Sequence, residues 1–145
     1  MVQLEKLDEN NWQEVSNLSV SKEQKEIFPI PNVYWIGISR YEEHTTLYAI
    51  KNENNNVGLV GIGYDEDGIS GYINPLMIDE RYQGKGYSKK AVECAIHLLK
   101  AEYSVKEIHM GHRKTNVIAG TLYEKFNFKI VGEDEQDYFR CLVLE

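Results

Sequence analysis

The residues best suited to bind an anion are two glycines separated by one lysine, Gly84-Lys85-Gly86. They follow an apolar run of strand length that ends at Ile78, and they precede apolar residues that recur at helical spacing to about Lys100. The pattern predicts a strand, a turn and then a helix that starts near Gly84. The first N–H groups of a helix have no partner within it, and the helix dipole adds partial positive charge there, so the turn predicts a phosphate site.

The side chains around this turn fit a diphosphate. Glycine has no Cβ, so a ligand can lie directly on the backbone at Gly84 and Gly86. Ser88 adds a hydroxyl, and Lys85 and Lys89 add positive charge. A helix entered through a glycine turn that binds nothing would show the same pattern. The turn gives little support for a nucleotide-binding site. The spacing of the phosphate loop of nucleotide hydrolases is missing, and no third glycine completes a dinucleotide fingerprint.

Two motifs resemble those of the GNAT superfamily of N-acetyltransferases. The first is Arg81-x-x-Gly84-x-Gly86, between the apolar strand and the amphipathic helix. The second, at a suitable distance downstream, is Asn116-x-x-Ala119-x-x-Leu122-Tyr123-Glu124-Lys125-Phe126-Asn127-Phe128. The resemblance covers roughly residues 45–145 well and the first 44 only in general layout. Within the superfamily, the segment from Ile78 to Lys90 is most similar to the small polyamine (spermidine and spermine type) acetyltransferases.

The resemblance implies an α/β fold of the acetyltransferase type, with a mixed, mostly antiparallel sheet of six or seven strands and helices on its faces. It implies acetyl-coenzyme A (acetyl-CoA) as the cosubstrate, with the pantetheine arm paired to backbone groups of a bulged strand. The side chains of that strand should mostly be core. The residues expected to bind acetyl-CoA are Leu76, Met77, Ile78, Gln83, Gly84, Lys85, Gly86, Tyr87, Ser88, Lys89, Asn116 and Tyr123.

Transfer of an acetyl group from a thioester to an amine requires that the departing thiolate be protonated. By the resemblance, Tyr123 is the general acid, since it stands seven residues after the motif asparagine. A tyrosine that only packs its helix is the alternative. Asn116 would hydrogen-bond the pantetheine arm, or it would cap its own helix.

The general base is missing from its usual place. In the similar polyamine enzymes a carboxylate occupies the strand position of Asn74, and an amide cannot accept a proton at neutral pH. Asn74 still suits a role in orienting the amine or a water. Glu66, His109 and His112 are the other candidates for the base, and for both histidines an ordinary surface or strand position is the favoured alternative.

These features predict acetyl-CoA-dependent N-acetylation of a primary amine of a small molecule, polyamine-like by resemblance. A module that binds acyl-CoA as a sensor without catalysis is the alternative, suggested by the missing carboxylate. An aminoglycoside, an aryl or alkyl amine and a protein N-terminus stay open as acceptors. A homodimer is compatible with the sequence, which does not fix the oligomeric state.

Composition and charge predict the domain count, the localisation and the kind of partner. The 145 residues, 42% of them hydrophobic, predict one domain over residues 1–145. We expect a cytoplasmic protein, because no membrane-length apolar run or secretion signal is present. Cys94 and Cys141 have no metal-ligand spacing, so we expect reduced cysteines and no metal. The formal net charge of −7 argues against nucleic acid as a partner and slightly favours a cationic substrate.

Several elements must position these residues. Three strands between Thr45 and Ile78 should form an antiparallel meander, and Asn74-Pro75 should bulge the third because proline cannot donate to a sheet. Glycines in the second strand suggest either a close approach by another group or a weak strand. The segment from Asn32 to Tyr41 should be a helix interrupted at Gly37, Thr115 should cap the last helix, and Asn127 should end it.

Overall fold

The computed structural model describes residues 1–145 and contains one seven-stranded sheet, in the order β1-β2-β3-β4-β5-β7-β6. All neighbouring strands are antiparallel except β4 and β5. The strands are β1 (Val2–Lys6), β2 (Thr45–Asn52), β3 (Asn55–Tyr64), β4 (Ser70–Ile78), β5 (Glu107–Arg113), β6 (Lys129–Glu133) and β7 (Asp137–Val143). The predicted α/β fold and the meander of β2, β3 and β4 are confirmed.

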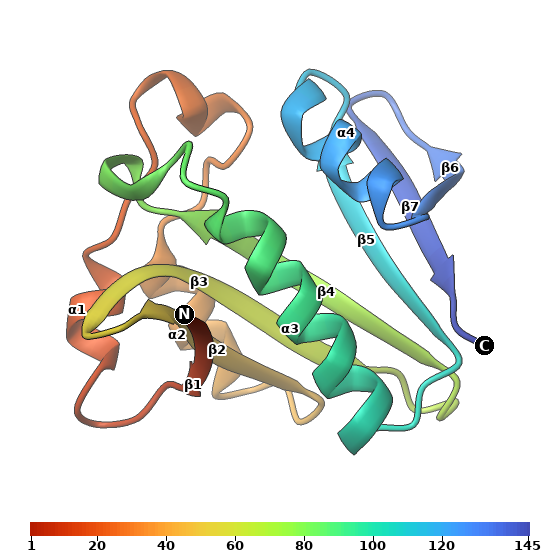
Figure 1. Ribbon diagram of the computed structural model, residues 1–145, viewed down its shortest axis with the longest axis horizontal. Coiled ribbons are helices and arrows are strands. Elements are labelled where there is room, and N and C mark those ends of the chain that lie inside the picture. Colours follow the sequence, from red (N-terminus) through yellow and green to blue (C-terminus); the bar gives the residue numbers. More distant parts are fainter.

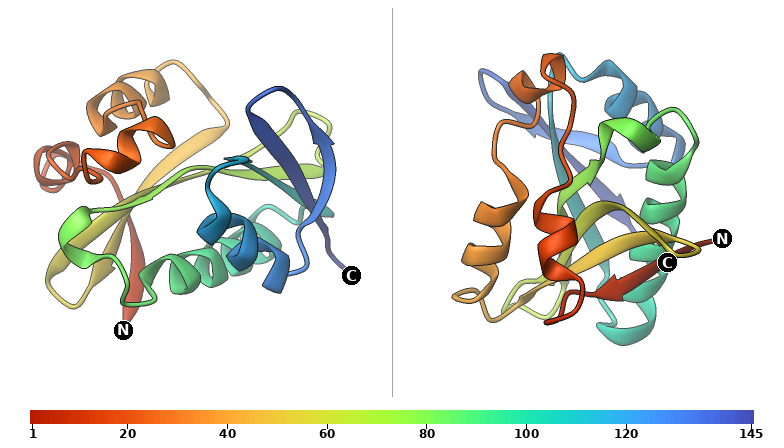
Figure 2. Two further views of the ribbon diagram at one scale, coloured as in Figure 1. Left: turned by 90° about the horizontal axis from the view of Figure 1, so that it is seen from above. Right: turned by 90° about the vertical axis from the view of Figure 1, so that its left-hand side faces the viewer.

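Helices cover both faces of the sheet (Figures 1 and 2). The α-helices are α1 (Trp12–Ser16), α2 (Asn32–Ser39), α3 (Tyr87–Glu102) and α4 (Val117–Lys125), and the two short 3-10 helices are η1 (Glu23–Glu26) and η2 (Glu80–Tyr82). Figure 2 shows α1 and α2 on one face and α3 on the other, with α4 on the same side as α3. No helix is both long enough and apolar enough to cross a membrane.

The core has two parts because the central strands are buried on both faces. Along β2, Leu47 and Ala49 pack under α1 and α2, while Tyr48 and Ile50 point to the α3 side. This is the alternation that a strand imposes on its side chains. Asn32 joins the two helices of the first layer, since its Nδ2 donates to the Val15 carbonyl at 2.9 Å.

The sheet opens between β4 and β5. These strands pair only where Ser70–Tyr72 meets Glu107–His109, and beyond that point they diverge (Figure 1). The predicted bulge lies just past the last pair: Val60 faces Leu76 and Ile62 faces Ile73, so Gly61 stands opposite both Asn74 and Pro75. Pro75 has no N–H to donate to a ladder, and the irregular pairing with β3 at Gly61 is the bulge that the sequence predicted.

The glycines of β3 accommodate β4 itself. A Cβ on Gly61 would lie 2.3 Å from the Asn74 carbonyl oxygen, and a Cβ on Gly63 would lie 2.3 Å from the Tyr72 ring. The expected close approach is confirmed, with the neighbouring strand as the approaching group.

Three local predictions need correction. The helix expected near Gly84 begins at Tyr87, because Gly84 and Gly86 have left-handed φ values of 78° and 82°. The α2 helix runs through Gly37 without a break. The cap of α4 is Asn116 and not Thr115, since the Asn116 side chain accepts a hydrogen bond from the Ala119 N–H. Asn127 does end that helix, with φ of 70°.

A pair of glycine variants tests the bulge. We expect Gly61→Ala to lower the free energy of unfolding by about 1–3 kcal/mol, because its Cβ overlaps the Asn74 carbonyl. Gly37→Ala is the matched control: its Cβ meets nothing within 4 Å, so it should stabilise α2 by about 0.5–1 kcal/mol. Urea unfolding followed by circular dichroism measures the free energy of unfolding of both variants. Equal changes in the two variants would contradict the close contact between Gly61 and the Asn74 carbonyl.

Candidate active site

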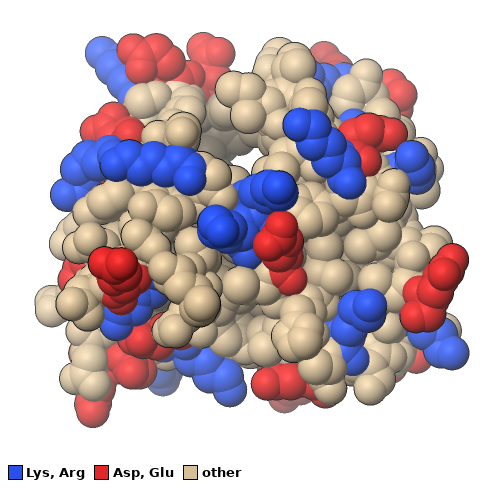
Figure 3. All heavy atoms as spheres, in the orientation of Figure 1, with Lys and Arg blue, Asp and Glu red and all other residues tan.

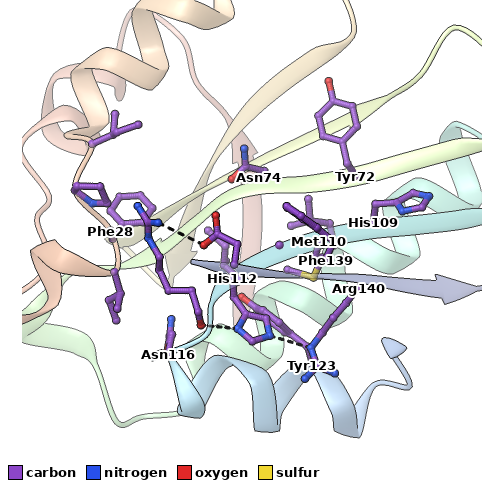
Figure 4. Close-up of a pocket in the computed structure, with 18 of the residues that line it drawn as sticks. Phe28, Tyr72, Asn74, His109, Met110, His112, Asn116, Tyr123, Phe139 and Arg140 are labelled. Carbon is purple, nitrogen blue, oxygen red and sulfur yellow. Dashed lines mark hydrogen bonds and ion pairs between the residues drawn. The ribbon is translucent and has the colours of Figure 1, made fainter. Parts of the chain in front are cut away.

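A cavity of about 720 Å³ lies where β4 and β5 separate (Figure 4). Its walls come from β4, β5, β7, α4, α2 and the segment 27–30, which precedes α2. In Figure 4, Asn74 on β4 lies across the cavity from His112 on β5 and from Tyr123 on α4. The bulge therefore brings together a predicted amine-orienting residue and the predicted general acid.

Tyr123 lines the cavity although only 6% of its side chain is exposed. It packs against His112 and Phe128 with ring centroids 5.7 Å and 6.2 Å away. Burial raises the pKa of Tyr123 to about 12 because the phenolate would be poorly solvated. The hydroxyl therefore keeps its proton at neutral pH, as a general acid requires.

Asn116 also lines the cavity and has two roles available at once. Its Oδ1 accepts the Ala119 N–H at 3.2 Å and so caps α4. An amide also carries two donor hydrogens on Nδ2, which the cap does not use. The capping and ligand-binding alternatives from the sequence are thus compatible in one side chain.

The backbone of β4 presents alternate residues to the opening. The Asp79 N–H donates to the Val57 carbonyl at 2.8 Å, and antiparallel pairing repeats every second residue, so Met77 is hydrogen-bonded to Leu59 on β3. Leu76 and Ile78 lie in the opposite phase and direct their backbone groups away from β3. Leu76, Met77 and Ile78 were expected to bind a pantetheine arm. Of these, Met77 is the one whose backbone groups point to β3 and not to the opening. The side chains of Met77 and Ile78 are buried, as predicted.

The start of α3 has backbone N–H groups without partners, as the predicted anion site requires. Gly86 is the N-cap and supplies no capping side chain, and the first helical bond runs from the Lys90 N–H to the Gly86 carbonyl. The N–H groups of Tyr87, Ser88 and Lys89 are therefore without helical partners. A Cβ on Gly84 or Gly86 would meet nothing within 4 Å, so the space above both is open.

Basic side chains gather over this part of the molecule (Figure 3). Arg81 precedes the turn and is held by Asp79, whose Oδ1 accepts from Arg81 Nε at 2.8 Å and from the Arg81 N–H at 3.0 Å. The Asp79 carboxylate also accepts the Ser19 N–H, so it ties the turn to the first layer of helices. Positive charge and open N–H groups together suit a diphosphate.

Two of the predicted binding side chains have other partners. Gln83 and Gln24 form a reciprocal amide pair with hydrogen bonds of 2.7 Å and 2.8 Å, and Gln83 Nε2 also donates to the Ile78 carbonyl at 2.8 Å. The Tyr87 hydroxyl accepts from Asn52 Nδ2 at 2.9 Å. Gln83 thus occupies the Ile78 carbonyl, which leaves the Ile78 N–H and both backbone groups of Leu76 for a ligand.

A second cavity of about 320 Å³ adjoins the first, and Trp35, Tyr72 and Asn74 line both. Two carboxylates, Glu42 and Asp65, line the second cavity, and neither forms an ion pair. Unpaired carboxylates facing a cavity favour a cationic guest. The sequence did not identify these residues, because they stand in loops 23 positions apart; their only signal was the acidity of the turns.

A chain of hydrogen bonds runs along this second cavity. Thr45 Oγ1 donates to Glu42 Oε2 at 3.1 Å, and Thr45 Oγ1 also hydrogen-bonds the Tyr72 hydroxyl. Since the Thr45 proton points to the carboxylate, the Tyr72 hydroxyl must donate to Thr45. The Tyr72 oxygen then has lone pairs free to accept a proton from a guest. The chain ends in the Glu42 carboxylate, whose oxygens accept hydrogen bonds.

The base candidates from the sequence fit less well. Glu66 is 90% exposed, lies 3.8 Å from His44 and lines neither cavity. His112 Nε2 accepts from Arg140 Nε at 2.9 Å and its Nδ1 contacts the Arg113 carbonyl at 2.9 Å, so both ring nitrogens are engaged. His109 lines the first cavity with its Nε2 3.1 Å from Glu107 Oε1.

Comparison with known proteins identifies the family of this chain. The sequence model of the acetyltransferase (GNAT) family matches residues 4–128. A spermine/spermidine N(1)-acetyltransferase of Bacillus subtilis is 40% identical over 84 residues, which cover 57% of this chain and 55% of that protein. An N-alpha-acetyltransferase of Saccharolobus solfataricus is 34% identical over 61 residues, which cover 42% of this chain and 36% of that protein. The chain thus spans about half the length of the first relative, and less of the second.

Solved structures match almost the whole chain. The spermidine N-acetyltransferase from Vibrio cholerae in complex with CoA and spermine has a TM-score of 0.81 at 16% identity, and the match covers 98% of this chain and 95% of that one. A Campylobacter jejuni N-acetyltransferase in complex with acetyl coenzyme A has a TM-score of 0.75 at 17% identity, with both chains fully covered. At these identities the matches show the fold.

Two valine variants test the anion site. We expect Gly86→Val to weaken CoA binding at least about tenfold, because the side chain strains a left-handed residue and fills the space over the open N–H groups. Gly68→Val is the control, since Gly68 also has a left-handed φ, of 71°, but lies in a hairpin turn that lines neither cavity. Calorimetric titration with CoA that gives equal affinities for both variants would remove the turn from the binding site.

Proposed function

Since the chain belongs to the acetyltransferase (GNAT) family, we propose that it transfers the acetyl group of acetyl-CoA to a primary amine of a small polycation such as a polyamine. The observation that carries the choice of acceptor is the second cavity, where Glu42 and Asp65 stand without cationic partners beside Asn74. Two carboxylates in one cavity suit an acceptor with two ammonium groups better than an acceptor with one.

The relatives support this choice. The protein of Bacillus subtilis that shares 40% identity is a spermine/spermidine N(1)-acetyltransferase, and the structure from Vibrio cholerae holds CoA and spermine. Our proposal extends these acceptors to this chain because its own second cavity has the matching charge.

In this proposal acetyl-CoA supplies the reactive thioester, and each end of the molecule has its own contacts. The N–H groups at the start of α3 and the nearby lysines bind the diphosphate. The backbone groups of Leu76 and the Ile78 N–H pair with the pantetheine arm, and Asn116 Nδ2 donates to it. These contacts place the thioester in the first cavity, between Asn74 and Tyr123.

We assign the base to the hydrogen-bonded chain from Tyr72 through Thr45 to Glu42. The ammonium group gives a proton to the Tyr72 oxygen, the Tyr72 proton passes to Thr45, and the Thr45 proton passes to Glu42. The neutral amine then attacks the thioester carbonyl, and the C–S bond breaks as Tyr123 protonates the thiolate. The nitrogen gives its second proton to the Tyr123 phenolate, and Glu42 releases the first proton to solvent. A carboxylate reached through two hydroxyl groups thus replaces the carboxylate that Asn74 lacks.

An acetyl-transfer assay tests the activity. Free thiol release should be observed with spermidine and other diamines, and it should exceed release with an aminoglycoside, an aryl amine or a peptide N-terminus at equal concentration. If CoA binds but no amine in the panel releases thiol, the chain is a sensor and the proposal fails.

Tyr123→Phe tests the acid. We expect turnover of the best amine to fall about 100-fold while CoA affinity changes little, because the ring keeps its packing and only the proton donor is lost. Tyr138→Phe, on β7 and outside both cavities, is the control. Turnover that is unchanged in Tyr123→Phe, measured where chemistry limits the rate, would return Tyr123 to a packing role.

Three substitutions separate amine binding from proton transfer. Thr45→Val keeps the size and all charges, so it should lower kcat about 100-fold with little change in the KM for the amine. Asp65→Asn should mainly raise that KM, and Glu42→Gln should do both. The control is Glu43→Gln, which removes the same charge outside the cavities. A normal kcat in Thr45→Val would exclude the relay, whereas an unchanged KM in Asp65→Asn would exclude the acceptor cavity.

A further inference from the structure

Three side chains of different chemistry meet on the face of β5 and β7 that α3 and α4 do not cover. Glu107 and His109 are two residues apart on β5, so they point to the same face. Cys141 is the cross-strand partner of His109 on β7. The ligand atoms of the three residues all lie within 4.8 Å of one another.

The spacing of these atoms is close to that of a tetrahedral metal site. His109 Nε2 lies 3.1 Å from Glu107 Oε1, and Cys141 Sγ lies 4.0 Å from His109 Nε2 and 3.9 Å from Glu107 Oε2. Zinc bonds of about 2.0 Å to nitrogen and oxygen and about 2.3 Å to sulfur place tetrahedral ligands about 3.3 Å (N to O) and about 3.5 Å (S to N or O) apart. Movements of about half an ångström close the site.

We propose that Glu107, His109 and Cys141 form a zinc-binding site. One thiol, one imidazole and one carboxylate make a donor set that suits Zn²⁺, whereas Mg²⁺ and Ca²⁺ prefer oxygen ligands alone. The metal replaces the Cys141 thiol proton, which leaves to solvent, and a water completes the fourth position. This revises the expectation of no metal, which rested on sequence spacing alone.

The surroundings support a site that an ion can enter. The side chains of His109 and Glu107 are 42% and 34% exposed, while Cys141 is 8% exposed and forms the floor. Ser70 Oγ donates to Glu107 Oε1 at 2.9 Å and orients the carboxylate, as a second layer of contacts does in zinc sites. The helices on the same face of the sheet as the site are α1 and α2. They pack on β3 and β2, which leaves β5 and β7 accessible on this face (Figure 2).

The position of the site between strands means that a bound ion would stabilise the fold. It lies where β4 and β5 are still paired, directly before they diverge, and His109 also lines the first cavity. Bound zinc cross-links β5 to β7 and, through Ser70, holds the end of β4. An ion that binds only the folded chain stabilises it, so zinc should raise the melting temperature.

The test uses the full chain without a histidine tag, reduced with a phosphine. Titration with ZnCl₂ should give one ion per chain, and Co²⁺ should give the near-ultraviolet charge-transfer band of a thiolate ligand. Cys141→Ser should abolish the band and weaken zinc binding at least tenfold. The chain has one other cysteine, and Cys94→Ser is therefore the matched control, which should bind as the wild type does.

Each outcome decides the proposal. A band that persists in Cys141→Ser, or wild-type protein that binds no zinc, overturns it. His109→Gln is a second variant that retains Cys141, and it should also lose tight binding and the zinc-dependent rise in melting temperature. Equal zinc stabilisation of wild type and His109→Gln would assign binding to other residues and overturn the site. Circular dichroism without metal verifies that each variant is folded.

Discussion

The whole site depends on the point where β4 leaves β5. The two strands pair only from Ser70 to Tyr72 on β4, and beyond Tyr72 the sheet opens on the β5 side. On the other side, β4 stays attached to β3 because Gly61 lets the Asn74 carbonyl approach where a side chain would collide. The result is a strand that is held firmly along one edge and has free backbone groups along the other. The first cavity and the residues proposed to contact the pantetheine arm lie along that free edge.

The two sides of the opening carry opposite charge. Open N–H groups and lysines lie at the start of α3, whereas the second cavity carries Glu42 and Asp65. A polyanionic ligand and a polycationic one are therefore drawn to different sides of the sheet. In the proposed reaction only the thioester and one amine need to meet, in the cavity between Asn74 and Tyr123, where burial keeps the tyrosine protonated.

Local signals in the sequence were sufficient for part of this description. The Gly84-Lys85-Gly86 turn, the bulge at Asn74-Pro75 and the end of α4 at Asn127 each depend on the backbone preference of one or two residues, and the structure has all three. The start of α3 was misplaced by three residues because left-handed glycines delay a helix, which apolar spacing does not reveal. Choosing Thr115 over Asn116 as the cap failed because neighbouring polar residues have similar capping preferences.

The remaining features depend on distances that no local pattern encodes. The phase of Met77 follows from the pairing of β3 with β4, and the approach of Thr45 to Tyr72 joins residues 27 positions apart. The cluster of Glu107, His109 and Cys141 requires β5 and β7 to be neighbours in a sheet whose strand order departs from the chain order.

The amide pair between Gln24 and Gln83 has a consequence for the geometry of the site. Gln83 belongs to the turn that leads into α3, while Gln24 belongs to η1, directly before the residues 27–30 that wall the first cavity. The same two side chains therefore hold the turn and the wall in one position relative to each other. The wall of the first cavity and the start of α3 are thus fixed together, although 59 residues separate the two glutamines in the sequence.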